Sequence, residues 1–384
     1  MVSDQLNDIF IAFRRELHQF PEISGLEQET QKRIKAFVGQ FRPDTLIEVG
    51  GTGLLLQYGT DGTGPVTLIR ADIDALPIQE TNTFAHKSVY AGVSHKCGHD
   101  GHTAILARLA SLLAEMPVQQ GRVYLVFQPA EETGQGAQAV LNDSTLNDLQ
   151  PDRVFALHNL PGFRQGVIVC KPGPFTASVL SMIVTFTGNV SHSAEPEKGL
   201  NPAYVMADFV LRSRQLQQPN PQSDDFALIT PVYTTMGEKS YGVSAGYGEV
   251  HVTLRTRNAK RMEALNAQLM TLLADLSAGS GIRVDTSYTE AFFASENDPD
   301  AFQQVKRSAE ELGYTFVEKS EPFKWGEDFG LFTQKYKGAM FGIGAGENSP
   351  ALHNDDYDFN DSLIEPAAQL FLELIKTKHM PAAT

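Results

Sequence analysis

The chain has 384 residues, 42% of them hydrophobic and 20% charged, which is the composition of a folded protein and the length of about two domains. Thirty-one basic residues stand against 46 acidic ones, and the net charge of −15 argues against nucleic acid or an anionic membrane as a general partner. Two cysteines are too few for a disulfide framework, and neither a secretory signal nor an apolar run of the roughly 18 residues that a membrane span needs is visible. We therefore expect a soluble, cytoplasmic protein.

The N-terminal part changes from a helical pattern to an alternating one. Two amphipathic helices are predicted first, over residues 3–17 and 27–41, and a proline follows each. Short apolar runs suited to buried strands come next, at residues 66–71, 122–128 and 153–158, with helices at 103–116 and 135–141. Strands separated by helices predict a parallel or mostly parallel sheet that is covered on both faces.

From about residue 178 the predicted order becomes β-α-β-β-α-β, which is the ferredoxin-like arrangement. Strands are expected at 181–187, 226–236, 248–257 and 282–288, and helices at 202–217 and 260–276. The α/β pattern then resumes, with helices at 300–312, 328–336 and 361–377 and strands near 315 and at 339–343. We predict an α/β domain, residues 1–177 and 289–384, interrupted by an inserted α+β domain, residues 178–288. Three domains in series would leave the last segment too few strands for a sheet.

Polar side chains follow four of the predicted strands of the α/β domain. They are Asp72 and Asp74, Glu131 and Glu132, His158 with Asn159, and His353. The carboxyl ends of the strands form the ligand crevice of an open α/β sheet, so we expect these side chains to converge.

The segment Cys97-Gly98-His99-Asp100-Gly101-His102 precedes the helix at 103–116. In an extended segment the side chains of Cys97 and His99 project to the same side and could reach one metal ion. Taken alone, the pair is a weak signal for metal, and a buried small residue beside a helix-capping His-Asp explains it better. Together with the strand-end histidines and the Glu-Glu pair, it predicts more ligands than one closed tetrahedral site accepts. A catalytic two-metal site with an open position for water is favoured.

Glu131 and Glu132 are neighbours whose side chains point in different directions, so one can bind metal while the other acts as general base. Taken alone, two carboxylates on a polar loop are better explained as ordinary solvated residues, but the other clusters reverse this interpretation. Asp74 either orients a metal ligand by a hydrogen bond without binding the metal itself, or is a turn or helix-cap aspartate. Asp328 either faces the cleft or caps the helix that follows it. His102 is expected to be a cap or packing partner rather than a ligand.

Six motifs, in this order and spacing, resemble the aminoacylase-carboxypeptidase family of two-metal amidohydrolases, which includes hippurate hydrolase and the plant auxin-conjugate hydrolases. They are Arg-Arg-Glu-Leu-His-Gln-Phe-Pro-Glu at 14–22, Arg-Ala-Asp-Ile-Asp-Ala-Leu-Pro at 70–77, the hexapeptide at 97–102, Gln-Pro-Ala-Glu-Glu at 128–132, Leu-His-Asn-Leu-Pro-Gly at 157–162 and Leu-His-Asn at 352–354. The resemblance covers nearly the whole chain.

The resemblance implies two divalent metal ions, Mn²⁺ or Zn²⁺ with Co²⁺ or Ni²⁺ as alternatives. The implied ligands are Cys97, His99, Glu132, His158 and His353. Glu131 is implied as the catalytic base, and the inserted domain as a lid that commonly mediates dimers.

In similar enzymes a lid histidine, often from the partner subunit, donates a hydrogen bond to the oxyanion, and His192 is the candidate here. The sequence departs from the usual pattern, because residues 188–194 read Gly-Asn-Val-Ser-His-Ser-Ala where Gly-Lys-Gly-Gly-His-Ala or similar is usual. The alternative is a hydrogen-bonded turn histidine.

The expected function is metal-dependent hydrolysis of the amide bond of N-acyl amino acids or related amides, by a metal-activated water with Glu131 as general base. Two alternatives stay open: a di- or tripeptidase or carboxypeptidase on the same scaffold, and a metal-containing binding protein that has lost turnover. The intact Glu131 argues against the binding protein, which needs no free carboxylate beside its ligands. The expected partners are a small acyl-amino-acid or short peptide substrate and a second copy of the chain.

Overall fold

The chain divides into two compact units in a computed structural model that describes residues 2–60, 62–146 and 149–380. The first unit comprises Met1–Phe175, Ser295–Ser320 and Asp328–Thr384, and the second comprises Thr176–Ala294 and Glu321–Glu327. The chain therefore passes between the units four times. No helix in the described ranges is long and apolar enough to cross a membrane.

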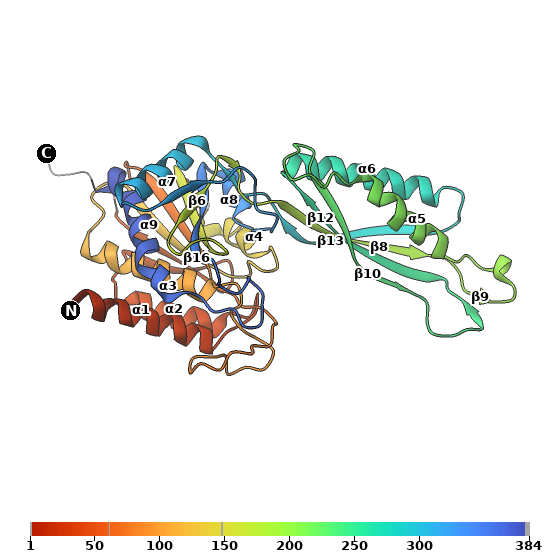
Figure 1. Ribbon diagram of the computed structural model, residues 1–384, viewed down its shortest axis with the longest axis horizontal. Coiled ribbons are helices and arrows are strands. Elements are labelled where there is room, and N and C mark those ends of the chain that lie inside the picture. Colours follow the sequence, from red (N-terminus) through yellow and green to blue (C-terminus); the bar gives the residue numbers. More distant parts are fainter. Residues whose placement is uncertain (1, 61, 147–148, 381–384) are drawn as a thin grey trace. The chain divides into compact units, whose positions relative to one another are not determined.

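The first unit is built on an eight-stranded sheet in the order β1-β2-β4-β3-β5-β16-β6-β15 (Figure 1). The strands are β1 Thr45–Val49, β2 Gly53–Tyr58, β3 Val66–Asp72, β4 Arg122–Gln128, β5 Arg153–Pro161, β6 Ile168–Cys170, β15 Phe316–Glu318 and β16 Gly338–Gly346. The central strands β4, β3, β5 and β16 are parallel to one another. Every residue of β3 is buried, as a central strand covered on both faces requires. A mixed α/β fold with a large, mostly parallel sheet is thereby confirmed.

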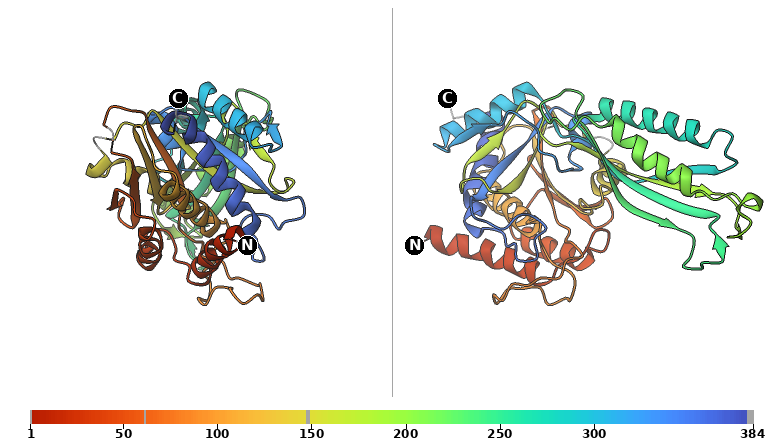
Figure 2. Two further views of the ribbon diagram at one scale, coloured as in Figure 1. Left: turned by 90° about the vertical axis from the view of Figure 1, so that its left-hand side faces the viewer. Right: turned by 45° about the vertical axis from the view of Figure 1, so that its right-hand side comes forward.

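Helices cover both faces of this sheet. Their bounds are α1 Val2–Gln19, α2 Gln28–Gly39, α3 His99–Glu115, α4 Gly136–Leu141, α7 Pro299–Glu311, α8 Gly330–Lys335 and α9 Ile364–His379. Helices α1, α2, α3, α7 and α9 share one hydrophobic core with the sheet, and α1, α3 and α9 lie side by side (Figure 2). Helices α4 and α8 contact each other, and they pack on β4 and β16 respectively. A short pair, β7 Gly173–Pro174 and β14 Glu296–Asn297, completes the unit.

Helix α3 begins at His99, four residues before the predicted start, so the expectation of an extended segment there is wrong. Gly98 has φ +95°, a left-handed conformation that favours glycine, and it turns the chain directly into the helix. The carboxylate of Asp100 accepts a hydrogen bond from its neighbour, the Gly101 N–H, at 2.9 Å. His99 and His102 consequently lie on the first turn of a buried helix, whose rigid backbone sets their positions.

The second unit has the element order β8 Ser178–Thr187, α5 Ala203–Ser213, β10 Ala227–Met236, β12 Tyr247–Thr256, α6 Ala259–Ser277 and β13 Arg283–Phe292. Its antiparallel sheet has the order β10-β12-β8-β13, and α5 and α6 cover one face. Burial alternates along β12, which is the period of a strand with one face on a core. A separate ribbon pairs β9 Ser191–His192 with β11 Val243–Ser244.

Residues 321–327, which we call the strap, belong to the second unit although both neighbouring segments belong to the first. The backbone carbonyl of Trp325 accepts a hydrogen bond from the N–H of Ala177 at 3.2 Å. The carbonyl of Lys324 accepts one from the guanidinium of Arg255 at 2.9 Å. The strap returns to the first unit at Asp328.

Candidate metal centre

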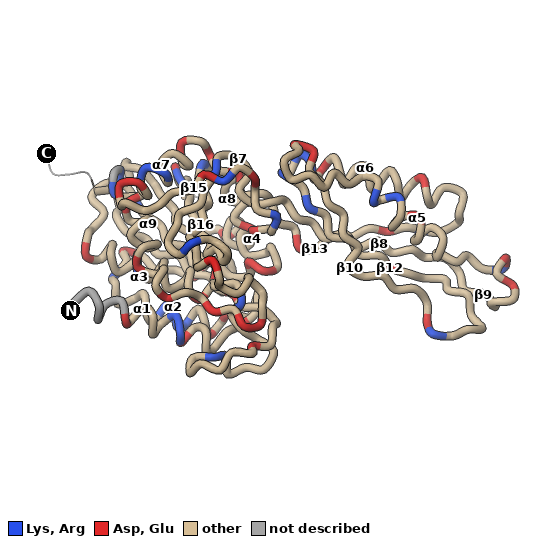
Figure 3. Tube along the Cα trace, in the orientation of Figure 1, with Lys and Arg blue, Asp and Glu red and all other residues tan. Residues whose placement is uncertain are grey.

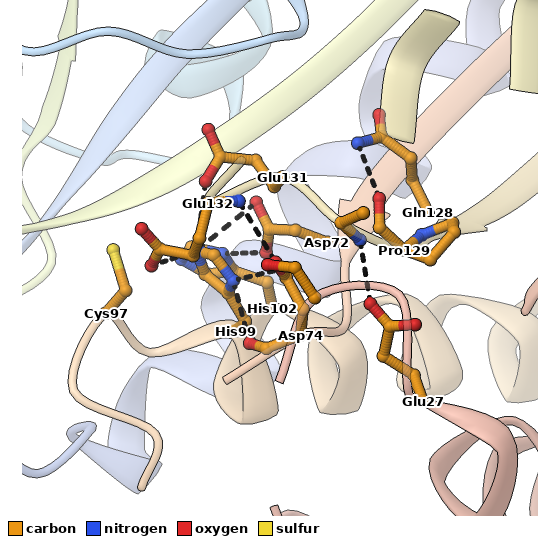
Figure 4. A network of polar contacts seen from close by, with 12 residues as sticks. Glu27, Asp72, Asp74, Cys97, His99, His102, Gln128, Pro129, Glu131 and Glu132 are labelled. Carbon is orange, nitrogen blue, oxygen red and sulfur yellow. Dashed lines mark hydrogen bonds and ion pairs between the residues drawn. The ribbon is translucent and has the colours of Figure 1, made fainter. Parts of the chain in front are cut away.

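The polar clusters expected at the strand ends converge in the first unit. Figure 4 shows the part of this convergence that involves the two Asp and two Glu residues, beside Cys97 and His99. Ligand atoms of Cys97, His99 and His158 lie within 4.8 Å of one another, and so do those of Cys97, Glu132 and His353. Cys97 belongs to both groups, so the two groups are adjacent. The structure thus brings together the five residues that the sequence suggests as ligands.

One ring nitrogen of His99, Nδ1, is fixed by Asp74, and the other, Nε2, faces the cluster. Its Nδ1–H donates to the backbone carbonyl of Asp74 at 3.0 Å and lies 3.1 Å from Oδ1 of the same residue. Nε2 is buried without a hydrogen-bond partner among the described residues, 3.8 Å from Oε1 of Glu132 and 3.9 Å from Oε2 of Glu131. Oδ2 of Asp72 also lies 3.8 Å from this nitrogen, and a buried imidazole nitrogen close to three carboxylates is the arrangement that a bound cation would complete.

Cys97 and His158 approach each other from a loop and a strand. The thiol Sγ is 3.4 Å from Nε2 of His158, whose Nδ1–H donates to the carbonyl of Asn159 at 2.8 Å. His158 lies inside β5 rather than at its end, because the pairing with β16 continues as far as Pro161. Burial holds the pKa of His158 well below its usual value, which keeps the imidazole neutral, the form that binds metals.

Glu132 and His353 close the other side of the cluster. Oε1 of Glu132 is buried without a hydrogen-bond partner among the described residues and lies 3.7 Å from Nε2 of His353. The backbone of His353 has φ +67°, and its N–H donates to the carbonyl of Lys96 at 2.7 Å. This bond places a half-exposed histidine from the C-terminal segment next to the residue that precedes Cys97.

The electrostatics of the cluster favour a cation. Burial, reinforced by the carboxylates of Glu132 and Glu131, raises the pKa of the Cys97 thiol well above its usual value. Burial raises the pKa of Glu132 to about 7. Burial lowers the pKa of His99, but the attraction of Asp72 and Asp74 outweighs it and raises the pKa to about 10. The pKa values of all three groups are raised, so their protonated forms are favoured, as expected where buried anions lack a countercharge. Divalent cations would supply that positive charge in place of the protons, and the donor set therefore fits them.

Glu131 stands beside this cluster, buried to 6% exposure and grouped with His99 and Glu132 within 4.8 Å. It lies on the loop of residues 129–136, which runs from the end of β4 to the first residue of α4. Its position next to His99, on the same side as Glu132, is compatible with the role of a base towards a molecule held in the cluster.

Asp72 and His102 form a hydrogen-bonded pair next to the cluster. Nδ1 of His102 is 2.6 Å from Oδ1 of Asp72, and Nε2 is 2.7 Å from Oδ1 of Asn159. Both ring nitrogens therefore have close partners, which agrees with a packing role for His102 rather than that of a ligand.

A buried network of charges that the sequence does not predict holds the start of α3. Nδ1 of His18 lies 2.8 Å from the carboxylate of Asp100, which Arg14 approaches to 3.3 Å. Nε2 of His18 lies 3.0 Å from Glu80, and Lys96 donates to Glu80 at 2.6 Å. The signal available was the position of Arg14 and His18 one turn apart on α1, within a motif of the resembling family.

His192 belongs to the second unit, where it lies exposed on β9. Its Nδ1 accepts a hydrogen bond from the N–H of Ala194 at 3.0 Å. In the neutral imidazole the hydrogen is consequently on Nε2, which leaves that nitrogen as a donor.

Residues 68–377 match the sequence model of the protein family described as peptidase family M20/M25/M40. The chain belongs to this family. The predicted resemblance is confirmed, and this M20 family member is an enzyme, a hydrolase of amide bonds.

Relatives within the family match over nearly their whole lengths. The N-acetylcysteine deacetylase of Bacillus subtilis (strain 168) is 30% identical over 97% of this chain and 98% of its own. The N-acetyldiaminopimelate deacetylase of Shouchella clausii (strain KSM-K16) is 30% identical over 95% of each chain. The YXEP protein of Bacillus subtilis, described as a dinuclear metal binding peptidase from the M20 family, is 28% identical and superposes with a TM-score of 0.81 over 97% of this chain and 98% of its own.

Proposed function

We propose that this M20 enzyme hydrolyses the amide bond of small N-acyl amino acids and depends on two divalent metal ions. The observation that carries the proposal is the pair of buried atoms without hydrogen-bond partners, Nε2 of His99 and Oε1 of Glu132, which face each other at 3.8 Å. The relatives named as deacetylases of N-acetyl amino acids support the substrate class, because they match over almost the whole chain.

Cys97, His99, Glu132, His158 and His353 would hold the ions. His99 is central because it occurs in three of the close groups, and Cys97 and Glu132 each occur in two. We propose Mn²⁺ or Zn²⁺, with Co²⁺ and Ni²⁺ as alternatives, since a mixed thiolate, imidazole and carboxylate set suits all four. When bound, such ions lower the pKa of a water and polarise a carbonyl group.

Glu131 is proposed as the general base that takes the proton of the attacking water and delivers it to the leaving amine. The residue is suited to this because it lies beside His99 and Glu132 on a buried loop. Asp74 keeps the Nδ1–H of His99 engaged, so that the nitrogen facing Glu131 and Glu132 is always Nε2. His192 is proposed as the donor to the carbonyl oxygen, through the Nε2–H that its bond from Ala194 leaves available.

The decisive experiment combines metal analysis with a substrate panel of N-acetyl and N-benzoyl amino acids, dipeptides and tripeptides, with and without chelator. We expect chelator-sensitive release of acetate or benzoate that returns when Mn²⁺ or Zn²⁺ is added. Turnover of the peptides alone would favour the peptidase alternative. Two bound metal ions without hydrolysis of any member would favour the binding protein.

We also propose that two copies associate through the second unit. Strand β10 is an edge strand without a charged residue, which Figure 3 shows as an uninterrupted tan segment. Val232 and Tyr233 on β10 are 58% and 51% exposed, and Tyr204 and Leu211 on α5 are 82% and 67% exposed. An uncharged edge beside exposed apolar side chains is a template for strand pairing with a second copy. Val232→Lys should lower the dimer fraction in analytical ultracentrifugation, and an unchanged sedimentation coefficient would contradict this interface.

A cytoplasmic location is proposed on the chemistry of the centre. Cys97 and Cys170 are both free and buried. A reducing compartment favours a thiol that serves as a metal ligand, because oxidation does not remove it there. Fractionation of the cells that produce the protein tests this location.

A further inference from the structure

The loop of residues 129–136 carries both the proposed base and a proposed metal ligand, yet only its last residue, Gly136, belongs to a helix or strand. Ala130 has φ +51°, which is unfavourable for a residue other than glycine. Within the loop, the Gly136 N–H donates to the Ala130 carbonyl at 3.0 Å and the Gly134 N–H to the Glu131 carbonyl at 2.8 Å. These short-range bonds shape the loop, but they do not attach its ends to the rest of the unit.

The attachment comes from Asp328, which is fully buried. At the start of the loop, Nε2 of Gln128 donates to both carboxylate oxygens of Asp328, at 3.0 and 2.9 Å. At its end, the N–H of Ala137 in the first turn of α4 donates to Oδ2 of Asp328 at 2.8 Å. One side chain from a distant part of the chain therefore accepts hydrogen bonds from the residues on both sides of the loop.

A buried carboxylate needs a countercharge, and Arg70 supplies it. The guanidinium donates to Oδ1 of Asp328 at 2.7 Å, to Oδ2 of Asp72 at 2.7 Å and to Oε1 of Gln128 at 2.9 Å. The same arginine thus ties Asp328 to the end of β3, where Asp72 supports His102. A fully buried network of this kind has one low-energy arrangement, because each displaced group would leave another without its partner.

We propose that Asp328 is a positioning residue that clamps both ends of the loop 129–136 and thereby sets where Glu131 and Glu132 stand. Between the two ends, Oε1 of Glu27 accepts the Ala130 N–H at 2.9 Å and Oδ2 of Asp74 accepts the Glu132 N–H at 3.0 Å (Figure 4). The roles of Glu131 and Glu132 rest on the proposed function, whereas the clamp itself is a statement about the loop.

The experiment compares amide hydrogen exchange in metal-free wild-type protein and the Asp328→Asn variant. An asparagine offers one acceptor oxygen where the aspartate offers two, so it cannot serve Arg70, Gln128 and the Ala137 N–H together. We expect exchange in peptides covering residues 129–137 to rise at least about tenfold, with little change in β3 and β5. Wild-type exchange in this loop would overturn the proposal.

The matched control is Asp143→Asn, beyond the other end of α4. Asp143 also accepts backbone N–H bonds, from Gly50 at 2.9 Å and Thr145 at 3.0 Å. This variant should leave the exchange of residues 129–137 at the wild-type rate. An equal rise in both variants would mean that the loop responds to any destabilisation of α4, and it would overturn the clamp.

A charge swap separates positioning from general stability. In the double variant Gln128→Glu with Asp328→Asn, a carboxylate again faces an amide beside Arg70, whereas Gln128→Glu alone sets two carboxylates against each other. We expect Asp328→Asn to lower kcat by about 10- to 100-fold with a smaller change in KM, and the double variant to recover part of this loss. No recovery of kcat and no recovery of loop protection would contradict the clamp.

Two further outcomes remain decisive. If Asp328→Asn does not fold, Gln128→Ala replaces it as the test, because this variant keeps the ion pair of Arg70 with Asp328. It should still raise amide exchange at the start of the loop, and a wild-type exchange rate there would overturn the proposal. If the wild-type enzyme hydrolyses none of the amides tested, the proposed function fails, whereas the exchange result on metal-free protein still decides the clamp.

Discussion

Nδ1 of His99 lies 3.1 Å from Oδ1 of Asp74, and the second carboxylate oxygen of Asp74 accepts the hydroxyl of Ser24 at 2.7 Å and the N–H of Glu132 at 3.0 Å. Burial alone would raise the pKa of Asp74, but the hydrogen bonds from His99 and Ser24 outweigh it and lower the pKa. The ionised carboxylate of Asp74 thus orients two proposed ligands: it contacts the side chain of His99 and the backbone N–H of Glu132.

Replacing Asp74 by alanine should therefore weaken metal binding by about 10- to 100-fold, because both His99 and the Glu132 backbone lose a partner. Competition with a fluorescent chelator measures the affinity. Ser24→Ala is the control, since it removes one hydrogen bond to Asp74 but none to a proposed ligand, and it should have a smaller effect. Equal losses would show that Asp74 acts only through general stability.

Glu131→Gln should retain both metal ions and lose at least about 10²-fold in kcat, because the amide cannot accept the proton of the attacking water. Glu132→Gln should instead lower the metal stoichiometry. Elemental analysis beside steady-state kinetics separates the two effects. Turnover of Glu131→Gln near the wild-type level would remove Glu131 as the base.

Gly98→Ala should lower both stability and metal affinity. An added Cβ would approach Oδ1 of Asn159 to 2.6 Å and the hydroxyl of Tyr357 to 2.9 Å, at a residue whose φ is +95°. The strain and the close contacts should together cost about 1–3 kcal/mol of unfolding free energy, measurable by chemical denaturation. Gly92→Ala is the matched control, because it has a positive φ of +76° with nothing within 4 Å of the added Cβ. An equal loss in both would assign the effect to backbone strain alone.

The buried pair of His18 and Asp100 predicts a loss of stability at alkaline pH. Burial lowers the pKa of His18, but hydrogen bonds to Asp100 and Glu80 outweigh it and raise the pKa from 6.5 to about 9. The protonated form is therefore favoured by folding, and its contribution is fully present below pH 6.5 and lost as the pH rises through about 9. Denaturation of metal-free protein across this interval should show the decline.

His18→Gln should flatten that decline. His86→Gln is the control, because burial lowers the pKa of His86 and the residue is neutral in both states above pH 6.5. A wild-type slope in the His18 variant would locate the titrating group elsewhere.

His192→Ala should lower kcat while both metal ions remain bound. If the histidine acts on the partner's site, mixing His192→Ala with Glu131→Gln subunits should restore activity, because one site of each mixed dimer then has both groups. Kinetics after exchange of subunits measure this. Absence of recovery in proven mixed dimers would favour action within one subunit.

Much of the first unit could be predicted from its sequence, because parallel strands buried on both faces leave continuous apolar runs. The strand predicted at 122–128 coincides with β4, and the polar residues after such strands converge because parallel strands end at one edge. The roles of the converging residues stay predictions.

The supports of the site could not be predicted, since they depend on pairings across the fold. Arg70 and Asp328 are 258 residues apart in sequence, and nothing in either neighbourhood indicates the other. The early start of α3 depends on the left-handed conformation of Gly98, at a position where an added Cβ would approach Asn159 and Tyr357, which are distant in the sequence. No pattern in residues 321–327 indicates the unit on which they pack.

The strap has a consequence for the exchange of modules between related enzymes. Because the chain passes between the units four times, joining Phe175 directly to Ser295 would delete most of the second unit but leave Glu321–Glu327 behind without the unit on which it packs. Asp328, which follows that segment directly, would then be attached to an unanchored stretch of chain. A transplant of the second unit should therefore carry two separate inserts, and recombination at a single pair of boundaries should yield poorly active chimaeras.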